Sequence, residues 1–328
     1  HALKAESTAI LSQRKIDFIW YSLPSWYPCL QGAILSKKFN VPFAIDYQDP
    51  WVYDTPPSMS WWHRERWTAR LARFLEPLAL KGCSFISAIN EDYMDGPLKR
   101  HSILRTKPNL AIQLGFDERD HNIEIAGLKN PWASDKKSIT YAGTYWPQGE
   151  PVFDLFLEAV KQIQDDGFWP NEFVVSFIGT KNPALQSLKD KANKMGIGDI
   201  INEYPNRIPY LHAQQFLRNS HAVMAFGSTA AHYSPSKVFQ LLLSGRPILA
   251  CFHPSSSIFD ILSECNGDQG MSRFESNDPH STKTQINQSL ARLFTGEMIW
   301  NPQLASLKNY SASSNGKKMT DTMESVLS

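Results

Sequence analysis

The sequence has no long hydrophobic segment and no excess of either charge. No uninterrupted apolar run reaches the roughly 18 residues that a membrane-spanning helix needs, so we expect none. Charged residues interrupt the first 15 positions, which leaves no apolar signal-peptide core there. Lys and Arg total 33 against 32 Asp and Glu, a net charge of +1. This balance argues against nucleic acid as a partner, and any anion site has to be local.

Cysteine is scarce, and several catalytic motifs are missing. The four cysteines form no CxxC pair and have no metal-like spacing with histidine, which is typical of reduced thiols in an intracellular protein. We therefore expect a cytoplasmic location. The chain has no Walker sequence, GxGxxG or nucleophile-elbow motif, which argues against an ATPase, a nicotinamide enzyme or a hydrolase triad. No DxD carboxylate pair follows a strand, so we expect neither metal nor cofactor.

Short apolar runs alternate with segments of helical periodicity along the whole chain. The expected strands are 16–23, 41–47, 84–89, 138–143, 173–179, 201–204, 221–227 and 247–251. The expected helices are 2–13, 65–80, 152–164, 184–195, 211–219, 284–294 and one from residue 319 onward. Continuous apolar strands separated by helices predict an α/β fold with parallel sheets covered on both faces.

A polar stretch and a loop at 117–136 divide these elements into two groups. We expect an amino-terminal domain over residues 1–125, a carboxy-terminal domain over 126–310 and a final helix at 311–328. The first group is short for a doubly wound domain. Ligands of such sheets bind beyond the carboxyl ends of the strands.

The stretch YSPSKVFQLLLSGRPILA, residues 233–250, is the most informative one in the chain. Ser234 or Ser236 can cap a helix, whose first turn offers unpaired backbone N–H groups at Val238 and nearby. Lys237 adds a positive charge where the helix dipole disfavours it, unless an anion such as phosphate offsets both. The alternative is an ordinary capped helix with a solvent-facing lysine.

Polar side chains also follow the expected strands at 41–47 and 138–143. Asp46, Gln48 and Asp49 would then face a cleft, although Asp49 could instead cap a turn before Pro50. Trp51 and Tyr53 could stack on the apolar face of a ligand or pack in the core. The backbone of Gly143 and Thr144 could approach a phosphate closely, since glycine leaves room for it.

Five segments together resemble glycosyltransferase family 4 of the GT-B fold, over nearly the whole chain and in the right order. These are VPFAIDYQDPW, QLGFDERD, SITYAGT, YSPSKVFQLLLSGRPILA and YSASSNGKKMTDTMESVL. The resemblance implies two Rossmann-like domains facing a cleft and a carboxy-terminal helix that returns to the first domain. The family's first strand and glycine-rich loop would precede residue 1, so we expect the first domain to be incomplete in this sequence.

The resemblance also implies an activity: retaining, metal-independent transfer of a hexosyl group from a UDP- or GDP-linked sugar to a glycan or lipid-linked glycan hydroxyl. Asp49 and Lys237 would be catalytic, and Asp46, Gln48, Trp51 and Tyr53 would bind the acceptor. The donor residues would be Gly143, Thr144, Arg207, Ile208, Ser234, Ser236, Lys237, Val238 and Gln240, with Arg207 and Ile208 at the base edge. Arg207 could equally be a solvated loop cation.

The chain departs from the family pattern at four positions. Gln240 and His232 replace the two acidic residues of the donor helix, Thr144 replaces an arginine, and Gln48 stands where arginine is usual. These departures keep two alternatives open: a non-catalytic GT-B-like protein that binds a nucleotide or sugar, and a GT-B epimerase of nucleotide sugars.

Tryptophan and arginine are concentrated in residues 51–73. Such mixtures can lie at a lipid headgroup interface, so peripheral contact with the inner face of a membrane is one expectation. The same residues could also line an acceptor groove or pack against a neighbouring helix.

Overall fold

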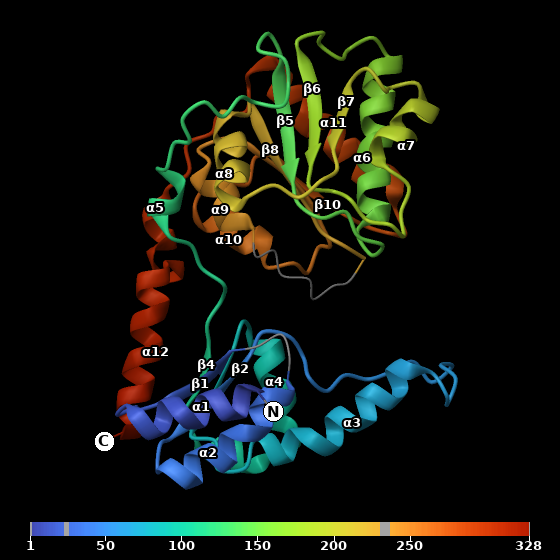
Figure 1. Ribbon diagram of the computed structural model, residues 1–328. Helices are drawn as coiled ribbons and strands as arrows, with labels where there is room; N and C mark the ends of the chain where they lie inside the picture. Colours follow the sequence, from blue (N-terminus) through green and yellow to red (C-terminus); the bar gives the residue numbers. More distant parts are fainter. Residues whose placement is uncertain (1, 23–25, 230–236, 328) are drawn as a thin grey trace. The chain divides into compact units, whose positions relative to one another are not determined.

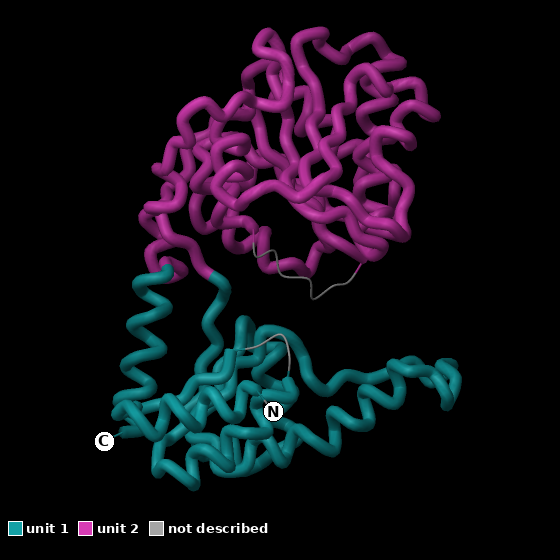
Figure 2. The backbone as a smooth tube through the Cα atoms, viewed as in Figure 1, with its two compact units in different colours: residues 1–114, 312–328 teal, residues 115–311 magenta. Residues whose placement is uncertain are grey.

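A computed structural model describes residues 2–22, 26–229 and 237–327 of the chain. It consists of two compact units, His1–Leu114 with Ala312–Ser328 (unit 1) and Gly115–Ser311 (unit 2), which Figure 2 colours separately. The boundary thus lies at residue 114 and not at 125. The reason is that helix α5 (Glu118–His121) packs against helices α8 (Tyr210–Asn219) and α9 (Val238–Leu243) of unit 2.

Unit 1 is built on a four-stranded parallel sheet in the order β1-β2-β3-β4. Its strands are Ile19–Ser22, Phe43–Tyr47, Phe85–Ala88 and Asn109–Ala111. Its helices are α1 (Ala2–Gln13), η1 (Tyr27–Gln31), α2 (Gly32–Phe39), α3 (Arg64–Ala79), α4 (Glu91–Arg100), η2 (Ser102–Thr106) and α12 (Ala312–Leu327). One face of the sheet packs on η1, α3 and α4, and Met319 of α12 packs on the other against Ala44 and Phe85.

Unit 2 contains a six-stranded parallel sheet in the order β10-β9-β8-β5-β6-β7 (Figure 1). In chain order its strands β5 to β10 are Lys137–Ala142, Phe173–Ile178, Ile201–Tyr204, Ala222–Phe226, Ile248–Phe252 and Met271–Arg273. The helices not yet given are α6 (Glu150–Asp165), α7 (Leu188–Met195), α10 (Ile258–Glu264), α11 (Pro279–Thr295) and η3 (Leu304–Tyr310).

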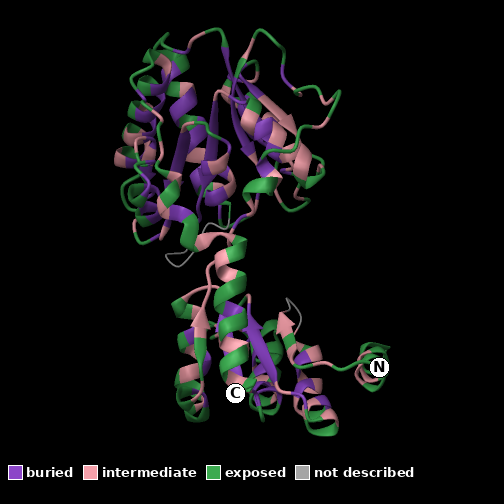
Figure 3. Ribbon diagram, turned by 90° about the vertical axis from the view of Figure 1, so that its left-hand side faces the viewer, coloured by how far each residue is buried: buried purple, intermediate pink, exposed green. Residues whose placement is uncertain are grey.

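Alternation along the strands of unit 2 sends side chains to two separate cores. In β8, Met224 and Phe226 face the core under α6, α7 and α11, whereas Val223 and Ala225 face α9 and α10. Figure 3 shows the consequence: buried residues concentrate along the strands, and exposed ones on the outer surfaces of the helices. The predicted fold class, α/β with two parallel sheets, is confirmed.

Eight strands were predicted from the sequence, whereas β4 and β10 were not. Both are three-residue strands, too short to show a hydrophobic period. The helices α2, α4, α5 and α10, of ten residues or fewer, were also not predicted, and the residue pattern alone placed the start of α12 seven residues too late. None of the helices in the described part of the chain is long and apolar enough to cross a membrane.

Candidate functional site

The candidate site lies where the connections of the unit 2 sheet change direction. From β5 the chain winds outward through β6 to β7, and it then returns through α8 to β8, on the other side of β5. The crossover helices that leave β5 and enter β8 therefore lie on opposite faces of the sheet. A crevice opens between the carboxyl ends of two such strands, and it is the usual ligand site of open α/β sheets.

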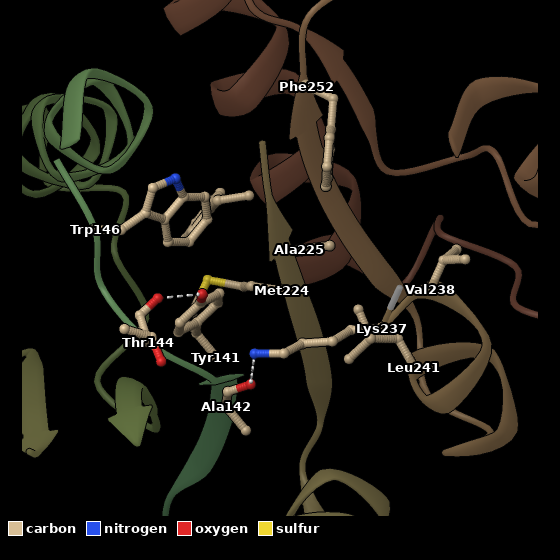
Figure 4. Close-up of a pocket in the computed structure, with 11 residues that line it drawn as sticks. Tyr141, Ala142, Thr144, Trp146, Met224, Ala225, Lys237, Val238, Leu241 and Phe252 are labelled. Carbon is tan, nitrogen blue, oxygen red and sulfur yellow. Dashed lines mark hydrogen bonds between the residues drawn. The ribbon is translucent and has the colours of Figure 1, made fainter. Parts of the chain in front are cut away.

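A cavity of about 330 Å³ occupies this position (Figure 4). Its walls come from the end of β5, from β8, from the end of β9 and from the start of α9. The lining residues are Tyr141, Ala142, Thr144, Trp146, Met224, Ala225, Phe226, Lys237, Val238, Leu241 and Phe252. The volume and the mainly apolar walls with few polar groups are typical of small-molecule sites.

Lys237 is the one charged side chain that lines this cavity among the described residues. It immediately precedes α9 and reaches back to β5, where its Nζ donates to the carbonyl of Ala142 at 3.3 Å. The ammonium lies 5.8 Å from the centre of the Tyr141 ring, within range of a cation–π interaction. Two elements far apart in sequence thus hold one cation at the mouth of the crevice.

The environment of Lys237 favours an anionic ligand. Burial first, and then the positive charge of Arg207, lowers the pKa of Lys237 from its ordinary value. Part of the side chain is nevertheless solvent-exposed, so solvent screening limits these effects and leaves a path for a ligand. Two neighbouring cations that repel each other are both stabilised when an anion binds close to them.

Gly143 provides the space that Lys237 occupies. A Cβ at this position would overlap the Lys237 ammonium and would lie 2.9 Å from the hydroxyl of Tyr141. That hydroxyl is held in place because it donates to the carbonyl of Thr144 at 2.9 Å. Any larger residue at 143 would therefore displace the lysine.

The amide of Gly143 corrects one expectation. We expected the Gly143 and Thr144 amides to bind phosphate, but the Gly143 N–H donates to the carbonyl of Ile178 at 2.8 Å. It extends the sheet, so glycine is needed here for space and not for a donor group. Thr144 is exposed at the rim of the cavity, and its amide remains a predicted phosphate ligand.

Of the other donor candidates that the structure describes, Val238 lines this cavity, whereas Arg207, Ile208 and Gln240 do not. Val238 is fully buried in the core, so only its backbone could serve a ligand. Gln240 hydrogen-bonds to Tyr210, and this bond opposes the burial that raises the pKa of Tyr210. Arg207 is exposed, and Ile208 packs against Trp132, Val174, Ile178 and Phe216. Ser234 and Ser236, together with His232, lie outside the described residues.

The acceptor candidates in unit 1 gather at the carboxyl end of β2. Asp46 is buried and accepts hydrogen bonds from Ser22 at 2.7 Å and Ser87 at 2.6 Å, and also one from Gln48. Asp46 thus connects β1, β2 and β3, and these bonds account for its burial. Asp49 follows β2 in an exposed position, and its charge, after burial, helps raise the pKa of Tyr93. Its catalytic role stays a prediction.

Trp51 belongs to the core of unit 1 and not to an open sugar platform. The side chain is 5% exposed, and its ring stacks on Trp26 with centres 5.3 Å apart and planes 6° apart. The core-packing alternative therefore describes Trp51, because the ring has no free face of useful size. Tyr53 is half-buried, and its stacking role remains a prediction.

Several cavity residues were not singled out from the sequence. Tyr141, Met224 and Phe252 look like ordinary strand residues, because only the arrangement of β5, β8 and β9 in the sheet places them in the wall of the cavity. Trp146 follows the glycine turn by three residues, and that proximity was the available signal. Among residues 2–22, 26–229 and 237–327, no three His, Cys, Asp or Glu side chains gather where they could hold a metal ion.

Two parallel-sheet units, with a carboxy-terminal helix that packs on the first, define a GT-B architecture. Solved structures share this fold at low sequence identity. One is Anabaena HepE in complex with UDP-glucose (TM-score 0.63, 15% identity, 98% of this chain and 82% of that chain). Another is a UDP-forming α,α-trehalose-phosphate synthase from Burkholderia xenovorans (TM-score 0.65, 13% identity, 100% of this chain and 78% of that chain).

A Listeria monocytogenes protein, described as a UDP-N-acetylglucosamine 2-epimerase, has the same fold in its crystal structure (TM-score 0.59, 11% identity, 99% of this chain and 78% of that chain). No protein-family model matches the sequence, and no curated protein sequence matches it. The GT-B fold is thus shown, whereas membership of glycosyltransferase family 4 remains a prediction.

Proposed function

We propose that this protein is a glycosyltransferase that moves a hexosyl group from a nucleotide sugar to a hydroxyl of a glycan or glycolipid. The observation that carries the proposal is Lys237, whose ammonium enters the cavity between the ends of β5 and β8. The fold supports it, since HepE was solved with UDP-glucose bound and the trehalose-phosphate synthase is UDP-forming.

The chemistry needs few protein groups at this position. As the glycosidic bond breaks, the leaving nucleoside diphosphate gains negative charge, and a fixed cation nearby lowers the barrier. Lys237 supplies that cation, and Arg207 adds positive potential. The Thr144 amide and the start of α9 are the proposed neutral donors.

In this proposal the reaction is metal-independent and retains the anomeric configuration. Lys237 takes the charge-neutralising role that a divalent cation has in other transferases. Asp49, Gln48 and Tyr53 of unit 1 are proposed to bind the acceptor hydroxyl, and the buried Asp46 to hold Gln48 in place through their hydrogen bond. The resemblance to family 4 supports retention, and NMR of the anomeric proton of the product would test it.

Nucleotide release tests the function directly. The purified chain is incubated with UDP- and GDP-sugars, with and without glycan acceptors, and free nucleotide is measured with and without EDTA. Acceptor-dependent release that EDTA does not change would support the proposal. Binding without release would favour a non-catalytic binding protein. Conversion of the donor sugar into another sugar would favour an epimerase, the activity named for the Listeria structure.

Lys237→Ala tests the site itself. A charge-assisted hydrogen bond contributes about 1.5–3 kcal/mol, so the affinity for UDP or GDP should fall by roughly 10- to 150-fold in calorimetry. Lys129→Ala removes an exposed lysine elsewhere in unit 2 and serves as the matched control. Unchanged affinity in Lys237→Ala would remove this residue from the site.

A further inference from the structure

Helix α3 carries an apolar row on its solvent side. Trp67, Leu71, Phe74 and Leu78 follow one another at spacings of four, three and four residues, and all four are exposed; Phe74 is 68% exposed. A helix of a globular protein normally turns such a row toward its core. In α3 the core-facing row is instead Ala69, Ala72, Glu76 and Ala79. The helix therefore has a second apolar face that this unit does not use.

The loop before α3 extends this apolar face. Trp62 is 80% exposed, and the Trp61 ring packs edge-on against Trp67 with centres 6.1 Å apart. Arg66 holds the loop to the helix, since it donates to the carbonyls of Pro56 and Pro57 at 3.2 Å each. In Figure 1 this end of α3 projects beyond the other helices of unit 1.

Arginines flank the apolar row on one side. Arg66, Arg70 and Arg73 are spaced by four and three residues and form a row of their own, and Arg64 precedes them. Arg70 lies 3.7 Å from the centre of the Trp61 ring, which keeps its charge next to the aromatic face. Against these four cations stand two exposed carboxylates, Asp54, which pairs with Arg73, and Glu65. The local charge is therefore positive although the chain as a whole is nearly neutral.

We propose that this α3 surface (Trp61, Trp62, Trp67, Leu71, Phe74 and Leu78 with Arg64, Arg66, Arg70 and Arg73) docks on an anionic lipid bilayer. An apolar helix face with arginines along its edge lies in the plane of the headgroups, with its aromatic rings at their level and its cations on the lipid phosphates. The positive charge complements anionic lipid, and each arginine near the surface adds attraction. This proposal is independent of the proposed transferase activity.

The α3 surface covers different residues from the segment that the sequence suggested for membrane contact. Membrane contact is one of the alternatives for residues 51–73, and within this segment Trp51 is in the core. The surface instead begins at Trp61 and continues to Leu78, where Phe74 and Leu78 complete the apolar row.

Vesicle flotation with the full chain tests the proposal. Vesicles of phosphatidylcholine alone are compared with vesicles that also contain phosphatidylglycerol, at low and high salt. We expect the chain to bind the anionic vesicles, and to bind them less at 1 M salt, where the Debye length falls to about 3 Å. Trp62→Phe should retain binding and lose part of the quenching of tryptophan emission by brominated acyl chains.

Matched substitutions distinguish vesicle binding by the α3 surface from non-specific binding through other exposed side chains. Phe74→Ser should lower the vesicle partition coefficient about tenfold, whereas Phe168→Ser, at a site 76% exposed in unit 2, should leave it unchanged. Arg64→Gln should lower it about fivefold, and Lys129→Gln, an exposed lysine in unit 2, should not. Circular dichroism confirms that each variant is folded.

Three results would overturn the proposal. The first is equal binding to neutral and anionic vesicles, and the second is an equal loss of binding in Phe74→Ser and Phe168→Ser. The third is self-association in sedimentation velocity that Phe74→Ser abolishes, without vesicle binding by the parent chain. That last result would assign the surface to a second copy of the chain.

Discussion

At the candidate site, the position of the Lys237 ammonium depends on the absence of a Cβ atom at Gly143. The lysine reaches the Ala142 carbonyl only because residue 143 has no side chain, and the Tyr141 hydroxyl closes the remaining side of that space. The proposed diphosphate site therefore depends on a residue with no polar side chain of its own.

Gly143→Ala should weaken UDP binding by about tenfold or more, because the new methyl group displaces the Lys237 ammonium and the charge-assisted bond is lost. Calorimetry measures the affinity. Gly316→Ala is the control, since a Cβ at that position in α12 meets no atom within 4 Å and the affinity should stay the same. Equal UDP affinity in Gly143→Ala and the parent chain would contradict this account.

The affinity for UDP should also depend on the charge of Lys237. Burial and Arg207 lower the pKa of Lys237 below its ordinary 10.5, and only the protonated form attracts the diphosphate. The affinity should therefore be full below this lowered pKa and fall as the pH rises through it, by up to about tenfold per pH unit. Lys237→Arg, which stays protonated, should show no such fall in the same titration. A parallel slope in both proteins would assign the pH dependence to another group.

At the scale of elements, Glu76 fixes α3 to its neighbours. This buried carboxylate, 1% exposed, accepts two hydrogen bonds of 2.7 Å from Arg100 of α4, and it also contacts His101 at 2.8 Å and the Tyr47 hydroxyl of β2 at 3.2 Å. Burial opposes the charge of Arg100, but the bonds to Glu76 outweigh it and raise the pKa of Arg100. The core-facing side of α3 is therefore anchored by polar contacts as well as by small apolar side chains, while its row of large apolar side chains is exposed.

Glu76→Gln should lower the free energy of unfolding of unit 1 by about 2–4 kcal/mol, because it leaves Arg100 without its partner in a partly buried position. Urea denaturation followed by circular dichroism measures this loss. Arg73→Gln breaks the exposed pair with Asp54 and should cost about 1 kcal/mol or less. Similar losses in the two variants would mean that burial of Glu76 adds nothing.

At the scale of the molecule, the two units have separate hydrophobic cores. The core around β2 and β3 is formed by residues of unit 1, and those around β5 and β8 by residues of unit 2. The proposed nucleotide cavity lies entirely within unit 2, and Glu76 lies within unit 1. Each unit can therefore be perturbed by itself.

Calorimetric unfolding should show two transitions that respond to different changes. Glu76→Gln should lower the temperature of one only. UDP at about 100 times its Kd should stabilise the other by about 2.7 kcal/mol, because the ligand binds folded unit 2 alone. A single transition that both changes shift would show that the two units unfold together.

The fold could be predicted in outline because its signals are local. The apolar runs at 41–47, 138–143 and 173–179 each became a parallel strand, and the period of residues 152–164 became α6. Short elements such as β10 and α5 could not be predicted, since neighbouring strands and helices stabilise them and not their own sequence. The extent of α12 was underestimated because its first turns include Ser, Asn and Gly, which are weak helix formers.

The sequence by itself determined the fold class, the choice of Lys237 as a candidate anion ligand and the concentration of tryptophan and arginine near α3, since each of these is a property of adjacent residues. Only the tertiary structure decided that Lys237 enters a cavity at the switch point, that the Gly143 amide belongs to the sheet, and that Trp51 is core while Trp62 and Phe74 are surface. The physical reason is that burial and hydrogen-bond partners depend on residues far apart in the chain, which only the packing of sheets and helices brings together.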